Sequence, residues 1–241
     1  MIEFQDVYKA FEEKPVLQGL SLTIRDAETV VIIGYSGTGK SVALKHIVGL
    51  LHPDAGDVIV DGQAVSTLDR DGLTALRQEI GYVFQFAALF DSLTVAENVE
   101  LGLRRRRLAD EEIDDRVREA LALVDLSGSE DRLPAELSGG MRKRVGIARA
   151  IALRPRYILY DEPTTGLDPV TAAVIDRLMV RTREHLGVTG VVVTHDMRSA
   201  YAVGDRIAML YEGRIRQVAS VAEIQETEDP LVRQFIEGNP E

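Results

Sequence analysis

The sequence predicts an α/β fold built on a mostly parallel sheet. First, short β-type runs alternate with helical patterns along the 241 residues, which is typical of parallel strands connected by helices. Second, residues 30–33 and 191–193 are continuous runs of Val and Ile, as expected for strands buried on both faces. Third, a glycine-rich stretch follows the first of these runs and opens a helical pattern, so a tight strand-to-helix turn is expected there.

Hydrophobic periodicity places the elements along the chain. Strands are expected at residues 2–7, 21–24, 29–33, 58–60, 81–84, 157–160, 190–194, 206–210 and 214–218. Helices are expected at residues 39–50, 111–124, 139–152, 169–184, 197–203 and 221–226. Pro169 suits the first turn of its helix, because an N–H group there has no partner within the helix.

These elements are expected to form a single domain over residues 1–241 with three parts. Residues 1–25 and 56–66, with a turn at Gly62, are predicted to form a small antiparallel sheet. Residues 86–154 have mostly helical patterns and interrupt the series of strands, so they are predicted to be a helical insertion. The remainder would be the α/β core that carries the glycine-rich turn.

Composition excludes several classes of function. The formal net charge is −11, so we expect no nucleic acid partner, because non-specific binding to nucleic acid needs a cationic surface. The absence of cysteine excludes disulfides, thiolate zinc sites, iron–sulfur clusters and cysteine nucleophiles. The four histidines are too few to suggest a histidine-rich metal site.

The chain is expected to be cytoplasmic. Its N-terminus carries acids within the first six residues and lacks an apolar core, unlike a signal peptide. The uncharged stretch at residues 80–90 is much shorter than the roughly 20 residues that a membrane-spanning helix needs. Contact with a membrane would therefore occur through a partner.

A phosphate-binding loop is predicted at residues 34–41. The sequence Gly34-Tyr35-Ser36-Gly37-Thr38-Gly39-Lys40-Ser41 matches the pattern GxxxxGK[ST] without a gap. Its glycines allow consecutive backbone N–H groups to turn toward phosphate oxygens, beside the positive end of a helix dipole. Lys40 would reach the β- and γ-phosphates of a nucleotide, and the Ser41 hydroxyl would ligate Mg²⁺. The alternative is an ordinary glycine-rich turn followed by an unrelated Lys-Ser pair.

A second feature is an apolar run at residues 157–160 that ends in two acids, Asp161 and Glu162. A buried strand would deliver Asp161 to the carboxyl edge of the sheet, where phosphate loops also lie. Asp161 would hold Mg²⁺, and Glu162 would polarise the attacking water as the catalytic base. The alternative is a strand that ends in a solvated acidic turn.

A second helix start at residues 137–141 is also suited to bind an anion. Ser138 is a favourable N-cap, and Gly139 and Gly140 leave the first N–H groups of the helix accessible. Two such helix starts with a single lysine-bearing loop are unusual in a monomeric nucleotide-binding protein. They are explained if the second start faces the γ-phosphate of a nucleotide held by another copy. The alternative is an ordinary serine-capped helix.

These motifs and their order resemble the nucleotide-binding subunits of ABC transporters, whose signature is usually LSGGQ where this chain has LSGGM. The resemblance covers residues 2–238 and identifies the fold as a P-loop NTPase of the ABC ATPase type. It implies that the chain binds ATP and Mg²⁺ and hydrolyses ATP. It also implies a head-to-tail homodimer that holds two ATP molecules, whose separation after hydrolysis drives an integral membrane permease.

Five further positions match family motifs. By this resemblance, Gln85 contacts Mg²⁺ and the attacking water, and Asp168 belongs to the segment that crosses the dimer interface near the nucleotide. His195 would meet the γ-phosphate as a further catalytic residue beside Lys40. Phe11 would stack on adenine with Val16 beside it. The alternatives are a capping or core role for His195 and a core role for Phe11.

A narrower resemblance is to the Mla/Mce-type (MlaF-like) phospholipid transport ATPases. It rests on residues 84–95, 137–144, 160–169 and 229–238. It implies an integral permease and an MCE-domain lipid-binding protein as partners, and transport of phospholipid between membranes. The chain would then lie at the inner face of the cytoplasmic membrane, held there by its permease.

Three groups of side chains have two interpretations each. Phe86, Leu89 and Phe90 would either grip a permease helix or fill the core of the helical insertion. The basic run at residues 104–107 would either face anionic lipid or a partner, or form a solvated face balanced by acids; we favour the latter. Residues 142–144 are expected to form an exposed helix face, from which one Arg could approach phosphate.

Three other functions are weighed against lipid transport. An ABC importer for a polar solute such as an amino acid would share every catalytic residue. A soluble ABC ATPase acting on nucleic acid or ribosomes would usually carry a long coiled-coil insert or two ATPase domains, and the charge of −11 disfavours it. A P-loop kinase outside the ABC family would leave residues 138–141 and His195 unexplained.

Overall fold

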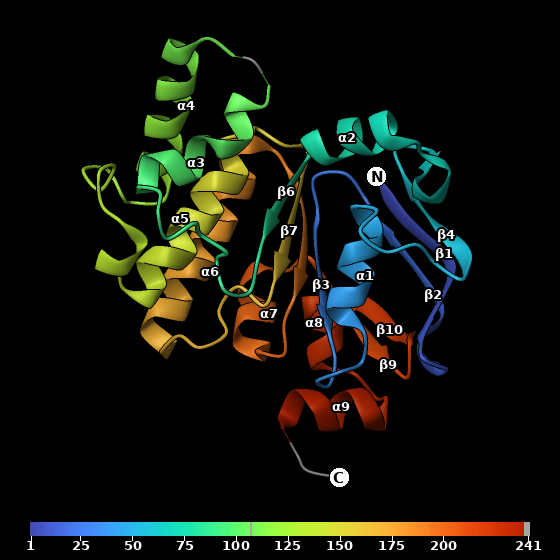
Figure 1. Ribbon diagram of the computed structural model, residues 1–241. Coiled ribbons are helices and arrows are strands. Elements are labelled where there is room, and N and C mark those ends of the chain that lie inside the picture. Colours follow the sequence, from blue (N-terminus) through green and yellow to red (C-terminus); the bar gives the residue numbers. More distant parts are fainter. Residues whose placement is uncertain (107, 239–241) are drawn as a thin grey trace. The chain divides into compact units, whose positions relative to one another are not determined.

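Residues 1–106 and 108–238 are described by the computed structural model of the chain (Figure 1). Their contacts divide the chain into two units, of which unit 1 comprises Met1–Arg77 and Thr189–Glu241. Unit 2 is the intervening segment Gln78–Val188. The single domain over residues 1–241 stays a prediction.

An antiparallel sheet forms the first part of unit 1, as predicted. Its strands follow the order β2-β1-β4-β5 and are β1 (Ile2–Phe11), β2 (Lys14–Ile24), β4 (Ala55–Val60) and β5 (Gln63–Ala64). β1 and β2 are longer than predicted because they continue to a tight turn at Glu12 and Glu13. Both turn residues have a positive φ, 47° and 65°. The sequence offers no Gly or Asn there to indicate such a turn.

The parallel strands of unit 1 carry the glycine-rich turn. They are β3 (Thr29–Ile33), β8 (Thr189–Val193) and β9 (Arg206–Tyr211), with β10 (Arg214–Ser220) antiparallel to β9. β3 is the parallel neighbour of both β8 and β9, with Val30 opposite Val191. Every residue of β3 and β8 is buried, which confirms the prediction of strands covered on both faces.

The remaining elements of the two segments around unit 2 are mostly short. They are α1 (Lys40–Ile47), η1 (Val65–Thr67), α2 (Arg70–Gln78), α7 (Met197–Val203), α8 (Val221–Gln225) and α9 (Pro230–Glu237). α1 begins directly after the glycine-rich turn, as predicted, but ends three residues before the predicted Leu50.

Unit 2 contains two parallel strands and a group of helices. The strands β6 (Ile80–Val83) and β7 (Tyr157–Asp161) pair with Ile80 opposite Tyr157. Between them in the sequence lie α3 (Val95–Arg104), α4 (Asp110–Leu123), η2 (Pro134–Glu136) and α5 (Gly139–Ile151). α6 (Pro169–Leu186) follows β7. The predicted helical insertion is therefore present between β6 and β7.

The helices α2, α3 and α9 were not predicted. α2 is a short helix whose apolar side consists of half-buried Leu73 and Leu76 only, which is too short a pattern to stand out in the sequence. The start of α3 did carry a signal, because Thr94 and Glu97 form a capping box. Asp229 caps α9 ahead of a proline at the first helical position, which is also a readable start.

Candidate functional site

The turn between β3 and α1 has the geometry of a phosphate-binding loop. Gly39 precedes the helix with a φ of 100°, and a Cβ atom there would lie 2.8 Å from Val16 Cγ1. Only glycine satisfies both the backbone angle and this close approach. No side chain among the described residues caps the start of α1. The first N–H groups of the helix therefore suit an anion.

Lys40 lies along this loop. Its side chain is buried, with 7% exposed, and Nζ donates to the carbonyl oxygens of Gly34 at 2.8 Å and Tyr35 at 2.9 Å. The Thr38 hydroxyl donates to the same Tyr35 carbonyl at 2.9 Å. An ammonium binds a charged phosphate more strongly than a neutral carbonyl. A bound phosphate would therefore draw Lys40 from the loop carbonyls toward its own oxygens.

His195 leaves the sheet at the same edge as the loop. It is exposed and follows β8, whose Val193 lies opposite Ile32 of the parallel strand β3. Asp196 then caps α7 by accepting from the Arg198 N–H at 2.9 Å. The capping role that was the alternative for His195 therefore belongs to its neighbour Asp196.

Phe11 and Val16 lie at the loop side of the antiparallel sheet. Phe11 is 42% exposed, so the core role for it is wrong, and Lys9 Nζ lies 5.7 Å from its ring centroid. Val16 is half-buried and reaches Gly39, as described above. These contacts leave the Phe11 ring able to take a planar group on its exposed side.

Sequence reasoning missed an aromatic contact on the phosphate loop. The Tyr35 ring meets Phe235 of α9 edge to face, with ring centroids 5.0 Å apart, and its centroid lies 6.5 Å from that of Tyr211. The start of α9 carries a local sequence signal, but a contact between this helix and a loop about 200 residues earlier has none.

In unit 2, β7 delivers the predicted carboxylates to its end. Asp161 is the last strand residue, is buried, and accepts from the Tyr82 hydroxyl at 3.1 Å. Burial raises the pKa of Tyr82, and the charge of Asp161 raises it further, so Tyr82 stays a donor to Asp161. Tyr82 is a second residue that sequence reasoning missed.

Glu162 is held in an unusual backbone conformation directly after the strand. Its φ is 49°, in the left-handed region that non-glycine residues rarely adopt. Its Oε2 accepts from the Thr165 hydroxyl at 2.9 Å, and its carbonyl accepts from the Thr165 N–H at 3.3 Å. The turn thus fixes both the backbone and the carboxylate of Glu162, whose catalytic role stays a prediction.

The prediction that residues 142–144 form an exposed helix face is wrong for Lys143. Lys143 is 7% exposed, and its Nζ donates to the carbonyl oxygens of Gln85 and of Glu162, the latter at 3.3 Å. Arg142 donates to the Leu137 carbonyl at 2.7 Å. Lys143 therefore joins two segments that carry predicted site residues.

The predicted signature forms the start of α5. Ser138 is the N-cap, and its hydroxyl accepts from the Met141 N–H at 3.2 Å. Gly139 is exposed, whereas a Cβ atom at Gly140 would lie 2.5 Å from the Thr171 methyl group. α5 therefore begins close to α6, whose N-cap is the exposed Asp168. Asp168 accepts from two backbone N–H groups at 3.0 Å each.

The segment after Gln85 presents aromatic rings to solvent. Phe86 is 82% exposed and Phe90 is 57% exposed, so the interpretation that these two rings fill the helical core is wrong; Leu89 is half-buried. The backbone beneath them is held by buried Asn98, which both accepts from the Phe90 N–H at 2.8 Å and donates to the Phe90 carbonyl at 3.1 Å. Among the helices of the described residues, none has the length and apolarity to cross a membrane.

The basic run is mostly tied to neighbouring groups. Arg104 pairs with Glu100 at 2.8 Å and lies 3.9 Å from Asp110. Arg106 donates to the Leu153 carbonyl at 2.8 Å. Arg107 lies outside the described residues.

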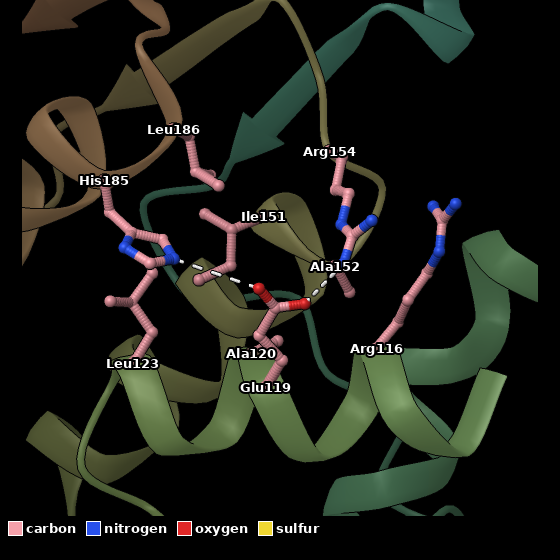
Figure 2. A pocket seen from close by; sticks show the side chains of 9 residues that line it. All are labelled: Arg116, Glu119, Ala120, Leu123, Ile151, Ala152, Arg154, His185 and Leu186. Atoms are coloured by element: carbon pink, nitrogen blue, oxygen red, sulfur yellow. Dashed lines mark hydrogen bonds and ion pairs between the residues drawn. The ribbon is translucent and has the colours of Figure 1, made fainter. Parts of the chain in front are cut away.

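A small hollow in unit 2 is lined by residues of α4, the end of α5 and the end of α6 (Figure 2). Glu119 stands at its rim with its carboxylate 2.7 Å from Arg154 and 3.8 Å from His185, and the floor is apolar. None of the predicted site residues lines it.

The structure thus gathers the predicted residues in two groups. In unit 1 the phosphate loop lies against Val16, and the same sheet edge carries His195. In unit 2 Lys143 links Gln85 with Glu162. A joint Mg²⁺ site of Ser41, Gln85 and Asp161 stays a prediction.

Residues 17–165 match the model of the ABC transporter family. The chain is 43% identical to TRIGALACTOSYLDIACYLGLYCEROL 3 of Arabidopsis thaliana, over 99% of this chain and 74% of that protein. It is 42% identical to the methionine import ATP-binding protein MetN of Xylella fastidiosa, over 98% of this chain and 72% of that protein.

The fold matches a solved structure of the ATP-binding cassette MJ0796, a dimer in a post-hydrolysis state bound to ADP and Pi. The TM-score is 0.83 at 38% identity, over 92% of this chain and 99% of the other. This match confirms the predicted P-loop NTPase fold of the ABC type. The chain belongs to the ABC transporter family, in which it is an ATP-binding, ATP-hydrolysing subunit.

Proposed function

We propose that each ATP is held by the phosphate loop of one chain and completed by the signature of a second copy. The backbone N–H groups of the loop and Lys40 bind the β- and γ-phosphates, and Phe11 stacks on adenine beside Val16. Ser138, Gly139 and Gly140 of the partner face the γ-phosphate. The uncapped start of α1 and the exposed start of α5 support an ATP site shared between the phosphate loop of one chain and the signature of another.

For hydrolysis, Glu162 orients and polarises the attacking water, and His195 contacts the γ-phosphate. The hydrogen bond from Thr165 supports this role, because it fixes the direction of the Glu162 carboxylate. Asp168 lies where the two copies meet.

Mg²⁺ would be ligated by the Ser41 hydroxyl, the Gln85 amide oxygen and Asp161. These are the hard oxygen ligands that Mg²⁺ prefers. The described residues contain no group of three or more His, Cys, Asp and Glu side chains able to hold a metal ion. When bound, the ion would neutralise charge that develops on the phosphates.

We further propose that the subunit drives an integral permease that moves phospholipid between membranes, together with an MCE-domain lipid-binding protein. The chain would act at the inner face of the cytoplasmic membrane. The observation that carries docking is the exposure of Phe86 and Phe90 on a backbone that Asn98 holds in place. The relative named for trigalactosyldiacylglycerol supports a lipid substrate, and the motif at residues 84–95 supports the lipid-transport branch.

Import of a polar solute such as an amino acid is the second candidate. The observation that favours it is the 42% identity to a methionine import protein. The same ATPase residues would serve both substrates, so the permease decides between them.

A capture experiment tests this proposal. The Glu162→Gln chain, which should trap ATP, is used with ATP to retain partners from membranes, and the retained proteins and lipids are identified by mass spectrometry. A multi-spanning permease with an MCE-domain protein and phospholipid would support lipid transport. A different permease without lipid would favour polar-solute import. Recovery of no membrane protein would contradict both.

Two variants in the Glu162→Gln background locate the docking surface. Replacing both Phe86 and Phe90 by Ser should abolish retention of the permease while ATP binding persists. Leu50→Ser is the matched control. Leu50 is an apolar residue as exposed as Phe90, at 56%, but it belongs to unit 1 and not to the segment after Gln85. Equal retention by the Phe86/Phe90 variant and the Leu50 variant would contradict this docking surface.

A further inference from the structure

Lys143 is a buried cation that connects two loops of unit 2. It lies on α5, two residues beyond the signature, and its Nζ donates to the main-chain carbonyls of Gln85 and Glu162. Gln85 is in the segment that follows β6, and Glu162 is the first residue after β7. One side chain therefore ties together the backbones of two residues assigned to hydrolysis.

A buried ammonium is costly, so stability alone is a poor explanation for it. Burial lowers the pKa of Lys143, and the negative charge of Glu162 opposes this shift. A well-packed apolar side chain would avoid the desolvation cost. Such a side chain could not bridge two carbonyl oxygens, which is the specific capacity that lysine supplies here.

Both carbonyls belong to backbone that needs external support. Glu162 has a φ of 49°, and the segment after Gln85 contains Ala87 and Ala88 with φ values of 59° and 47°. Such conformations cost free energy in non-glycine residues and persist only where surrounding contacts impose them. Lys143 supplies a contact of this kind to each segment at once.

Neighbouring cations on α5 hold only one segment each. Arg149 donates to the Ala87 and Ala88 carbonyls at 2.6 Å and 2.7 Å, which both belong to the segment after Gln85. Arg144 donates to the Val124 and Asp125 carbonyls at 3.2 Å and 2.9 Å, far along the sequence from both loops. The bridging arrangement is therefore particular to Lys143 among these three.

We propose that Lys143 is a positioning residue that couples the aromatic docking segment at residues 86–90 to the catalytic carboxylate of Glu162. Displacement of the segment by a partner moves the Gln85 carbonyl, and Lys143 passes this movement to the Glu162 backbone. The inference rests on the proposed role of Glu162 in hydrolysis and adds the connection that would regulate it.

The test compares full-length wild-type, Lys143→Met, Lys143→Gln, Lys143→Arg and Arg144→Met chains. We expect Lys143→Met to lower kcat by about 10- to 100-fold, because small misplacement of a catalytic group costs about this much. KM for ATP should change by less than about threefold, because binding belongs to the phosphate loop. Lys143→Arg should recover part of kcat, since a guanidinium can donate to both carbonyls.

Hydrogen–deuterium exchange gives a readout independent of activity. Lys143→Met should speed exchange in residues 85–90 and 162–167 together, whereas Arg144→Met should speed it near residues 124–126 only. kcat is expressed per ATP-binding chain, so that partial unfolding is not counted as lost catalysis. If Lys143→Met does not fold, Lys143→Gln supplies the same comparison, because its amide retains a donor without the charge.

The outcomes separate this inference from the proposed function. Equal kcat and exchange profiles for the Lys143→Met and Arg144→Met chains would overturn the coupling. So would faster exchange in only one of the two segments. If Glu162→Gln retained full turnover, the proposed role of Glu162 would fail instead, whatever the Lys143 variants did.

Discussion

The functional loops of the two units are held by different kinds of contact. In unit 1 the phosphate loop is shaped by a left-handed glycine, has no side-chain cap on α1, and carries the buried cation Lys40 against its own carbonyls. In unit 2 the helix start at α5 is capped by Ser138, and the carboxylates Asp161 and Glu162 are each fixed by a hydroxyl donor. Under the proposed function, the phosphate loop of unit 1 holds the anion and the carboxylates of unit 2 act on it.

This difference predicts a division of measurable effects. Substitutions of the phosphate loop and of Phe11 in unit 1 should change ATP affinity first, and substitution of Glu162 in unit 2 should change turnover first. A phosphate-loop variant that loses turnover but keeps its ATP affinity, or a Glu162 variant that loses ATP affinity but keeps its turnover, would contradict this difference between the units.

The largest effect is expected from Glu162→Gln. Loss of a positioned general base should lower kcat by about 10²- to 10⁴-fold. ATP affinity should be little changed, because the amide is close in size to the carboxylate and the phosphate loop is intact. Single-turnover hydrolysis together with equilibrium binding of ATP measures both quantities. Turnover near the wild-type rate would remove Glu162 from its proposed role.

Lys40→Ala should weaken ATP binding by about 10- to 100-fold, the loss of a hydrogen bond to a charged group. Titration with a fluorescent ATP analogue measures this. Lys45→Ala is the matched control, because Lys45 is exposed in the last turn of the same helix. Affinity that falls equally in both variants would indicate a general charge effect and contradict the loop interpretation.

Phe11→Ala should weaken ATP binding by about fivefold to tenfold, which is the lower part of the range for stacking a base on an aromatic ring. Binding of inorganic triphosphate should be unchanged, because it has no base to stack. Tyr8→Ala is the control, since Tyr8 is on the same strand and exposed to the same extent. A base-independent loss of affinity would place Phe11 outside the adenine site.

Glu119→Gln should have the smallest effect and should leave both affinity and kcat unchanged. The hydrogen bond from Arg154 lowers the pKa of Glu119 below its usual value of about 4.3 (Figure 2). The ion pair therefore stabilises the fold above that pH, and this contribution is lost as pH falls through the lowered pKa. Both groups are largely exposed, so the expected cost is below about 1 kcal/mol in urea unfolding at pH 7. A large fall in kcat of the Glu119→Gln chain would contradict this expectation and would place the hollow in the catalytic machinery.

Much of unit 1 could be predicted from the sequence, because the patterns that indicate its elements are formed by residues close together in the chain. A continuous apolar strand, a glycine-rich turn and the start of a helix lie within residues 29–41, and each indicates the next. The longer hairpin could not be predicted, because Glu12 and Glu13 adopt positive φ values that their side chains do not suggest.

In unit 2 the positions of several site residues depend on contacts between segments that are distant in sequence. The positions of Asp161 and Ser138 followed from a strand end and a helix cap, which are local signals. Lys143 looked like part of an exposed basic face, because nothing beside it in sequence reveals that carbonyls 19 and 58 residues away meet its ammonium. Tyr82 was missed for the same reason, since its partner Asp161 lies 79 residues away.

The central claim is that the signature of α5 completes the ATP site of another copy. Its most direct test is the mass of the Glu162→Gln chain in solution, measured by light scattering with ATP and Mg²⁺, with ADP, and without nucleotide. We predict the mass of two chains with ATP only, with one ATP bound per chain. One ATP bound per chain at the mass of a single chain would contradict the shared site.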